Sequence, residues 1–290
     1  MQPLVRSTLC LALALAAMLI AGTARGAPCD RLRGAEQKAT VDALLRTQHA
    51  YDCCDETIAQ CLKKPRVCKL ARRLRDDICR RVEKGETPEA VERALRRRAE
   101  SMLPGGRPAS IDLAQAAMAG DPAAKTTVVV YACASCPFCA KVIPEVYRAV
   151  TTGSSKGKAK LYFRLFPIRG HQDSTASNIA FQAAHRLGAF WPYVLHAFAN
   201  FGPYSAARQT ASAKAAGLDP AAFASMTNDP AVRDAVVASK KEGILNRVEG
   251  TPAFFVNGRR ITADPDGETI LDLLDEETDR VAGAAYCAGK

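Results

Sequence analysis

The sequence has few residues of the kinds that bind nucleic acids or cross membranes. Aromatic residues make up 6% of the 290 residues, and none interleaves with the basic clusters. Base-stacking surfaces of the kind that bind single-stranded nucleic acids are therefore not expected. The apolar run over residues 9–20 is shorter than the about 20 residues that a membrane-spanning helix needs. We expect no nucleic-acid partner, and membrane contact only through a partner protein.

The cysteine pattern lacks the fourth ligand that a metal site would need. The run Cys133-Ala-Ser-Cys136-Pro-Phe-Cys139 resembles the start of an iron–sulfur motif, but Ile143 stands where a fourth cysteine is required. A tetrahedral zinc site would need a ligand from elsewhere, and Cys287 is the only distant cysteine in this half. We expect neither a metal nor a cofactor, with zinc as the alternative.

Residues 1–26 have the organisation of a secretory signal. Arg6 supplies the positive start, residues 9–20 the apolar core, and Ala24-Arg-Gly26 a small-x-small cleavage site. We expect a cleaved, exported protein in the periplasm or outside the cell, where disulfides persist. An uncleaved anchor is the alternative.

Ten of the eleven cysteines follow this segment, in two groups with even counts that suit pairing within two units. The first group is Cys29, Cys53, Cys54, Cys61, Cys68 and Cys79; the second is Cys133, Cys136, Cys139 and Cys287. A Pro/Gly-rich stretch over residues 103–110 separates them. We expect a Cys-rich helical domain over residues 27–103, a linker over 104–119 and a second domain over 120–290.

The first domain has helical periodicity over residues 39–102. One predicted helix presents an apolar face formed by Val67, Leu70, Leu74, Ile78 and Val82. Gly85 ends it, and Thr87-Pro opens the next helix. So short a unit has a limited core, which favours a helical hairpin stapled by three disulfides. A second redox centre, a dimerisation arm and a partner-docking module are the alternatives.

The basic residues cluster on these predicted helices. Much of the net charge of +10 lies in Arg72-Arg73, Arg80-Arg81 and residues 96–98. A solvated helix face is the favoured interpretation. An acidic partner or an anionic membrane surface is the alternative.

A Cys-x-x-Cys at a predicted helix start is the most informative motif. Residues 127–130 predict a strand, and Cys136 follows where a helix begins, with Pro137 in its first turn. A thiol at this position faces unpaired N–H groups and the positive end of the helix dipole, which favour the thiolate. Cys139 lies one turn further on. The spacing indicates a reversible dithiol switch, although zinc knuckles and structural disulfides share it.

The second domain alternates strands and helices. The expected order is a strand at 127–130, a helix to residue 150, a strand at 160–166, a helical block over about 172–247, a hairpin at Asn257-Gly258 and a helix from 267 to about 281. This order predicts an α/β fold.

Residues of about 120–282 resemble the DsbA-type thioredoxin-fold proteins. The resemblance rests on Gly120-Asp-Pro, on Cys136-Pro-Phe-Cys139 with Pro144 behind it, on residues 189–193 and on Gly250-Thr-Pro252 with the residues that follow. It implies a thioredoxin-like fold with an inserted helical block, preceded by the small Cys-rich all-α domain. Residues of about 50–102 resemble cytochrome c maturation protein H more faintly, because Cys53-Cys54 replaces a spaced Cys-x-x-Cys.

The DsbA-type resemblance implies roles for several residues. Cys136 would be the nucleophile and Cys139 the resolving thiol, with Pro252 in the cis form beside Cys136. The substrate contacts implied are Thr251, Pro252, Pro137 and Phe138. The backbone of Thr251 would pair with an extended substrate.

The direction of electron transfer is open at this level. Phe138 replaces the histidine of the best-known DsbA, and Val130 stands where thioredoxin-type proteins often carry a buried acid. Thr251 before the cis-proline occurs in the isomerase and reductase branch as much as in the oxidase branch. These residues do not indicate a strong oxidant.

We therefore expect an exported thiol–disulfide oxidoreductase, which exchanges disulfides with cysteine-containing exported proteins and is reset by a redox partner. One alternative is a reductase or isomerase linked to cytochrome c maturation. The other is a non-catalytic thioredoxin-fold module that binds peptides.

The remaining cysteines and histidines have less certain roles. We favour an accessory disulfide between Cys133 and Cys287, with an accessory thiol at Cys133 or a mobile resolving thiol at Cys287 as alternatives. His171 follows the second strand, and we expect a loop or capping role for it. We expect His185 and His196 to be structural.

Overall fold

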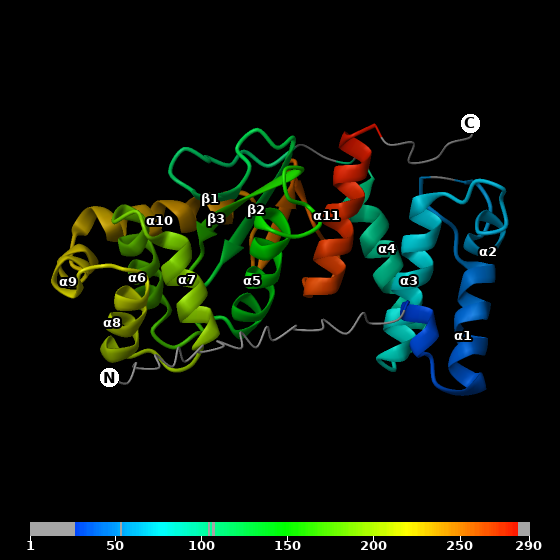
Figure 1. Cartoon of the computed structure of the whole chain (residues 1–290), viewed down its shortest axis with the longest axis horizontal. Helices are drawn as coiled ribbons and strands as arrows, with labels where there is room; N and C mark the ends of the chain where they lie inside the picture. The colour runs from blue at the N-terminus through cyan, green and yellow to red at the C-terminus, as the bar shows by residue number, and fades with distance from the viewer. Residues whose placement is uncertain (1–26, 53, 104, 106–107, 284–290) are drawn as a thin grey trace, which may run out of the picture.

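The structure is a computed structural model that describes residues 27–52, 54–103, 105 and 108–283 (Figure 1). The expected signal segment, Cys53 and Cys287 lie outside the described residues. Among those described, no helix is both long and apolar enough to cross a bilayer.

The N-terminal part is a helical bundle, which we call the helical module (residues 27–103 as described). Its elements are η1 (Pro28–Arg31), α1 (Gly34–Thr47), α2 (Ile58–Cys61), α3 (Lys69–Glu83) and α4 (Pro88–Met102). The chain leaves the helical conformation between α1 and α2, where the sequence periodicity predicted a more continuous helix. Thr57 restarts the helix with a reciprocal capping box to Gln60, and Thr87 caps α4 with Pro88 in its first turn.

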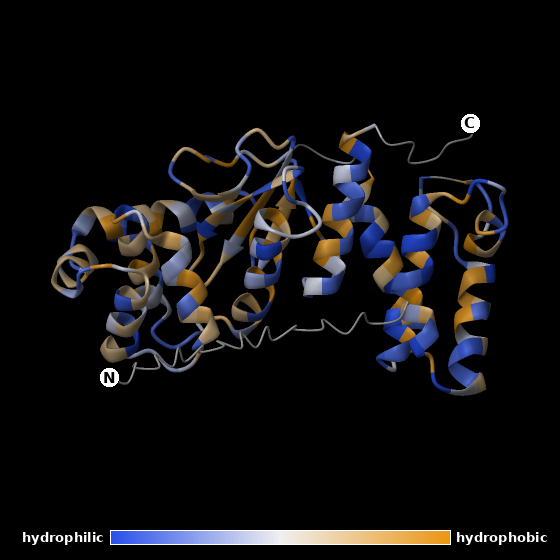
Figure 2. Cartoon of the chain, in the orientation of Figure 1, coloured by the Kyte–Doolittle hydropathy of each residue, from blue (hydrophilic) through white to orange (hydrophobic). Residues whose placement is uncertain are grey.

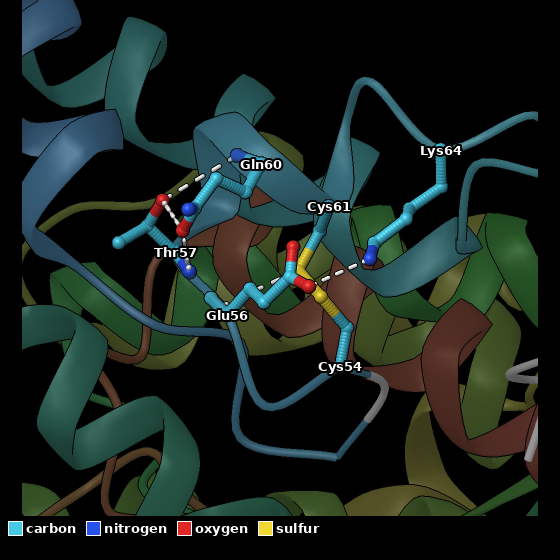
Figure 3. Close-up of a disulfide and its surroundings, with 6 residues drawn as sticks. All are labelled: Cys54, Glu56, Thr57, Gln60, Cys61 and Lys64. Atoms are coloured by element: carbon cyan, nitrogen blue, oxygen red, sulfur yellow. Dashed lines mark hydrogen bonds and ion pairs between the residues drawn. A yellow bond between two sulfur atoms is a disulfide. The ribbon is translucent and has the colours of Figure 1, made fainter.

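Disulfides staple the small core of this module. Cys29 is bonded to Cys79, and Cys54 to Cys61 (Figure 3); Cys68 is also disulfide-bonded. The fully buried residues between the helices include Ile58, Leu70 and Ile78. Covalent links across so limited a core restrict the unfolded chain and so stabilise the fold.

The second part is built on a five-stranded mixed sheet. Its strands are β1 (Ala117–Gly120), β2 (Thr126–Ala132), β3 (Ala159–Leu165), β4 (Ala253–Val256) and β5 (Arg259–Arg260), in the spatial order β1-β3-β2-β4-β5. The pairing of β2 with β3 is parallel, and the other neighbouring strands are antiparallel. The turn between β4 and β5 contains Asn257 and Gly258, both at positive φ, as the hairpin signal predicted.

Both faces of the central strand β2 are buried. Val128 and Val130 face the core cluster that includes α5 (Pro137–Thr151) and α11 (Gly267–Val281). Val129 and Tyr131 pack on the opposite face with Phe255. Helix α11 covers the range that the sequence predicted. A strand buried on both faces reads as a continuous apolar run, which explains why residues 127–130 showed no alternation.

The helical block lies between β3 and β4 in the sequence and at one end of the molecule (Figure 1). It consists of α6 (Ser174–Arg186), α7 (Phe190–Ala199), α8 (Ala206–Ala215), α9 (Pro220–Thr227) and α10 (Pro230–Leu245). Edge-to-face contacts of Phe190 with Phe163 of β3 and with Phe181 of α6 anchor the block to the sheet. The structure thus has the α/β fold with an inserted helical block.

Helix α11 lies between the sheet domain and the helical module (Figure 1). Helices α3 and α4 are largely hydrophilic along their length (Figure 2). Several of their basic side chains pair with acids on or just before α11: Arg73 and Arg80 with Asp272, Arg73 and Lys69 with Asp279, Lys84 with Glu268, and Arg81 and Arg97 with Asp264.

This pairing corrects the prediction that the arginine clusters form a solvated helix face. The prediction holds for Arg72 and Arg96, whose side chains are exposed. The other arginines meet an acidic helix about 200 residues away in the sequence. A local charge pattern cannot reveal a partner so distant, and the acidic partner is part of the same chain.

Arg98 is the buried centre of this contact. Its guanidinium lies 2.6 Å from Asp272, 2.6 Å from Glu276 and 3.3 Å from Asp77, and the residue is 1% exposed. Tyr51 adds a hydrogen bond to Glu276. Burial opposes ionisation of Asp272, but the charges of Arg98 and Arg80 outweigh it and lower the pKa of that carboxyl. The Asp272 carboxylate therefore remains charged and paired across the contact.

Candidate active site

Two loops of the sheet meet at the start of α5. Cys136 is the N-cap residue of α5 and follows β2 through a tight turn, while the segment before β4 contains Thr251 and Pro252. Tyr131 of β2 pairs with Ala253 of β4 in antiparallel register. The end of β2 and the beginning of β4 therefore lie at the same edge of the sheet, which brings Cys136 and Thr251 together.

The contact between the two loops is direct. Cys136 Sγ lies 3.4 Å from the carbonyl oxygen of Thr251, and the Thr251–Pro252 peptide bond is cis, as the resemblance implied. The Thr251 hydroxyl is buried and has no hydrogen-bond partner among the described residues. It can donate to the sulfur once a thiolate forms.

The surroundings of Cys136 favour the thiolate. A hydrogen bond from the Cys139 thiol, acting against burial and together with the N–H groups of Cys139 and Phe138 and the Thr251 hydroxyl, lowers the pKa of Cys136 to about 5. No charged side chain is among these causes. The backbone at the helix start therefore supplies much of what a neighbouring histidine would provide.

Cys139 has the opposite character. Its side chain is completely buried in the apolar cluster that contains Val130 and Val142. Burial, followed by the hydrogen bond and the charge of Cys136, raises the pKa of the Cys139 thiol well above its usual range. The pair thus consists of one sulfur that ionises readily and one that keeps its proton.

The loop at the start of α5 combines a buried sulfur, that of Cys136, with the exposed side chain of Phe138. Cys136 is 1% exposed, whereas Phe138 is 69% exposed and is among the most exposed large apolar side chains described. A substrate sulfur can reach Cys136 only by lying closely against its neighbours. Phe138 offers an apolar contact directly beside the point of approach.

Comparison with known proteins identifies the fold and the family. A family model described as Thioredoxin matches residues 114–276, more than half of the chain. The chain belongs to the thioredoxin family.

Two solved structures of this fold are similar at low sequence identity. BdbD from Bacillus subtilis, in its oxidised form, is 16% identical with a TM-score of 0.52 and covers 61% of this chain and 100% of its own. The thiol-disulfide exchange protein alpha-DsbA2 from Wolbachia pipientis is 20% identical with a TM-score of 0.50 and covers 58% of this chain and 88% of its own. These likenesses show the fold.

The matches to two curated relatives cover short segments of much longer proteins. An Na(+)/H(+) antiporter NhaA from Herminiimonas arsenicoxydans is 29% identical over 96 residues, 33% of this chain. The antiporter NhaA 1 from Salinispora arenicola is 33% identical over 140 residues, 47% of this chain. The matches cover only 16% and 21% of those antiporters, respectively.

Cys133 of this thioredoxin-family chain is a buried free thiol. Its sulfur lies 3.1 Å from Ser174 Oγ, 3.5 Å from His171 Nδ1 and 3.6 Å from Asn178 Nδ2. The other member of the expected accessory disulfide, Cys287, lies outside the described residues, so that disulfide stays a prediction.

The dithiol lies at a helix start as the sequence predicted, whereas the polar cluster around Cys133 was not predicted. Pro137 and Phe138 adjoin Cys136 in the first turn of α5, as predicted. Ser174 and Asn178 were not identified, although their spacing of four residues at the start of α6 places them on one helix face. The backbone N–H of His171 donates to the carbonyl of Ile168, which fits the loop role expected for this residue. In addition, its side chain contacts Cys133.

His185 and His196 lie in the helical block. His196 Nδ1 is 3.0 Å from Ser212 Oγ, in agreement with a structural role. No group of three or more metal-ligating side chains is found in the part of the chain that the structure describes.

Proposed function

We propose that the chain is an exported enzyme that introduces disulfides into cysteine-containing proteins, with Cys136 as the exchanging sulfur and Cys139 as its resolving partner. The observation that carries the proposal is the position of Cys136 at the start of α5, with its sulfur 3.4 Å from the Thr251 carbonyl and its pKa lowered to about 5. Thiolate stabilisation favours the reduced form, so the oxidised form readily gives up its disulfide.

The reaction follows thiol–disulfide exchange. A substrate thiolate attacks Cys136 Sγ of the Cys136–Cys139 disulfide, and Cys139 leaves and takes up a proton. The second substrate thiolate then attacks the substrate sulfur of the mixed disulfide and releases Cys136 as a thiolate. The substrate loses two electrons and the enzyme gains them. A redox partner must remove these electrons before the next cycle.

The difference between the two sulfurs suits the second step. Cys136 leaves as a stable thiolate, whereas Cys139 keeps its proton in its apolar surroundings. An exposed Phe138 and the backbone of Thr251 flank the attacked sulfur, so an extended substrate segment can lie along the loop. Pro137 and Pro252 complete the expected substrate contacts.

Two observations support export to an oxidising compartment. The first 26 residues have the signal-like pattern described above, and closed disulfides staple the helical module. We propose the periplasm or the cell exterior as the location, with cysteine-containing exported proteins as substrates.

The reduction potential of the Cys136–Cys139 pair tests the function and its direction. We expect a value nearer to the about −120 mV of DsbA than to the about −270 mV of thioredoxin. A value near thioredoxin's would favour the reductase or isomerase alternative. A value below about −300 mV would indicate a structural bond in a non-catalytic module.

Trapping tests the nucleophile. The Cys133→Ser/Cys139→Ala variant, offered a cysteine peptide in mixed-disulfide form, should accumulate an adduct at Cys136 that mass spectrometry of tryptic peptides locates. The matched control is Cys136→Ala, which retains the buried Cys139 and should form none. Equal adduct formation in both variants would contradict the assignment.

A further inference from the structure

We propose that Cys133 is a second resolving thiol, which can take Cys136 away from a substrate when Cys139 does not. This proposal rests on the proposed function, because it needs Cys136 to form mixed disulfides. It assigns a chemical role to the third cysteine of the run Cys133-Ala-Ser-Cys136-Pro-Phe-Cys139, which the two-cysteine mechanism leaves unused.

A tight turn brings the backbones of Cys133 and Cys136 close together. The N–H of Cys136 donates to the carbonyl of Cys133 at 3.1 Å, which closes a tight turn through Ala134 and Ser135. Such a turn holds its first and fourth Cα atoms within about 7 Å. Disulfides join Cα atoms about 4.4–6.8 Å apart. The backbone therefore already brings Cys133 and Cys136 near the separation that a disulfide requires.

Polar groups that can donate to or accept from the Cys133 sulfur surround it. Ser174 Oγ accepts a hydrogen bond from the Ile168 N–H, which leaves its hydroxyl hydrogen available for the sulfur 3.1 Å away. The amide Nδ2 of Asn178 is a further donor. His171 Nδ1, 3.5 Å away, is within reach to accept the thiol proton. An imidazole beside a thiol is the arrangement that activates cysteine nucleophiles.

The polar groups around Cys133 include a buried oxygen that has no hydrogen-bond partner among the described residues. Asn178 is completely buried, yet its Oδ1 has no hydrogen-bond partner among the described residues. His171 and Ser174 also line a cavity of about 470 Å³ together with Pro167, Asp173 and Lys240. A cysteine that served only as a small apolar filler would need neither a histidine nor donors around it. The side of Cys133 that faces α6 therefore has polar groups for the sulfur and its proton, and two of these groups, His171 and Ser174, border a cavity.

The proposed step is balanced. Cys133 Sγ attacks Cys136 Sγ of the mixed disulfide while its proton passes to His171 Nδ1. The bond between Cys136 and the substrate sulfur breaks, and the substrate leaves as a thiolate. A Cys133–Cys136 disulfide remains, and Cys139 can later displace Cys133 to restore the Cys136–Cys139 bond. No electrons beyond those of the mixed disulfide are needed.

Oxidised glutathione tests the proposal without a protein substrate. In the Cys139→Ala variant, Cys136 should attack the glutathione disulfide and release one glutathione. Cys133 should then expel the second and leave a Cys133–Cys136 disulfide that mass spectrometry of tryptic peptides detects. In the matched Cys133→Ser/Cys139→Ala variant, the adduct should persist at Cys136. We expect the adduct to disappear about tenfold or more faster in the variant that retains Cys133.

The role of His171 has its own readout. Adding His171→Ala to the Cys139→Ala variant should slow loss of the adduct by about a hundredfold near neutral pH, and the difference should shrink in more alkaline solution, where thiols ionise without a base. A merely structural histidine would give the same ratio at every pH. Thermal unfolding of each variant shows that the comparison is made on folded protein.

The outcomes separate the two proposals. Equally stable adducts with and without Cys133 would overturn the second resolving thiol and leave Cys136 as the nucleophile. If neither variant reacts with oxidised glutathione, both the proposed function and this role of Cys133 are wrong. A Cys133–Cys136 disulfide that forms as the glutathione adduct at Cys136 disappears supports the proposal.

Discussion

The helical module and the sheet domain use cysteine in opposite ways. Cys29, Cys54, Cys61 and Cys79 are closed into disulfides around a small helical core, whereas Cys133, Cys136 and Cys139 are free thiols in a large apolar core. In Figure 3 the Cys54–Cys61 bond joins a loop to the short helix α2. The cysteines of the sheet domain instead surround a helix start. Their surroundings, not their number, decide whether cysteines stabilise or react.

The largest effect should come from removing the reactive sulfur. Cys136→Ala should lower the rate of disulfide exchange about a thousandfold or more, because no other described thiol combines the helix start with the Thr251 contact. The measurement is turnover of a fluorescent glutathione disulfide. The matched Cys54→Ser/Cys61→Ser variant removes two sulfurs from the helical module and should keep the rate. A similar loss in both variants would erase the distinction between the two regions.

The buried arginine that joins the regions should matter next. Arg98→Met leaves Asp77, Asp272 and Glu276 without their shared cation, and breaking a buried ion pair in this way costs about 3–5 kcal/mol. Arg96→Met, on the same helix but exposed, should change the free energy of unfolding by about 0.5 kcal/mol or less. Urea unfolding measures both. Equal losses would show that the contact between the regions is not centred on Arg98.

The two described disulfides of the module should differ in effect. Cys29–Cys79 closes a loop with a sequence separation of 50, and Cys54–Cys61 one with a separation of 7. Loop-closure entropy predicts losses of about 4 and about 2.5 kcal/mol, respectively, when each pair is changed to serine. Urea unfolding under oxidising conditions compares the pairs. The reverse order would mean that strain or local packing outweighs loop length.

The smallest effect is a pH dependence of the reduced enzyme. Because the pKa of Cys136 is lowered to about 5, its alkylation by iodoacetamide should fall about tenfold from pH 7 to pH 4. The thiolate stabilises the reduced fold fully above the ordinary thiol pKa of about 8.5, and this contribution is lost as the pH falls through about 5. A midpoint near 8.5 would show that the helix start does not stabilise the thiolate.

Much of the fold was predictable because its signals are local. The hairpin at Asn257-Gly258, the final helix over Gly267–Val281 and the dithiol at the start of α5 each depend on neighbouring residues. The strand β1, only four residues long, was not predicted, because its pairing with β3 decides its conformation.

The parts that could not be predicted depend on contacts between distant segments. The partners of Cys133 come from α6 and the loop before it, about 40 residues later. The acids that pair with Arg73 and Arg98 lie on α11. Similarly, Phe138 indicated a less stable thiolate, yet the Cys139 thiol and backbone N–H groups lower the pKa of Cys136. Side-chain identities alone do not report that contribution.

The acidic side of α11 has a practical consequence for dividing this chain. A truncated chain that began after the helical module would expose Asp272, Glu276 and Asp279 without their cations, on a helix that packs against α5. The repelling carboxylates would act directly behind the helix that carries Cys136. We therefore expect the truncated chain to fold stably only if it keeps the helical module or if these acids are neutralised at the same time.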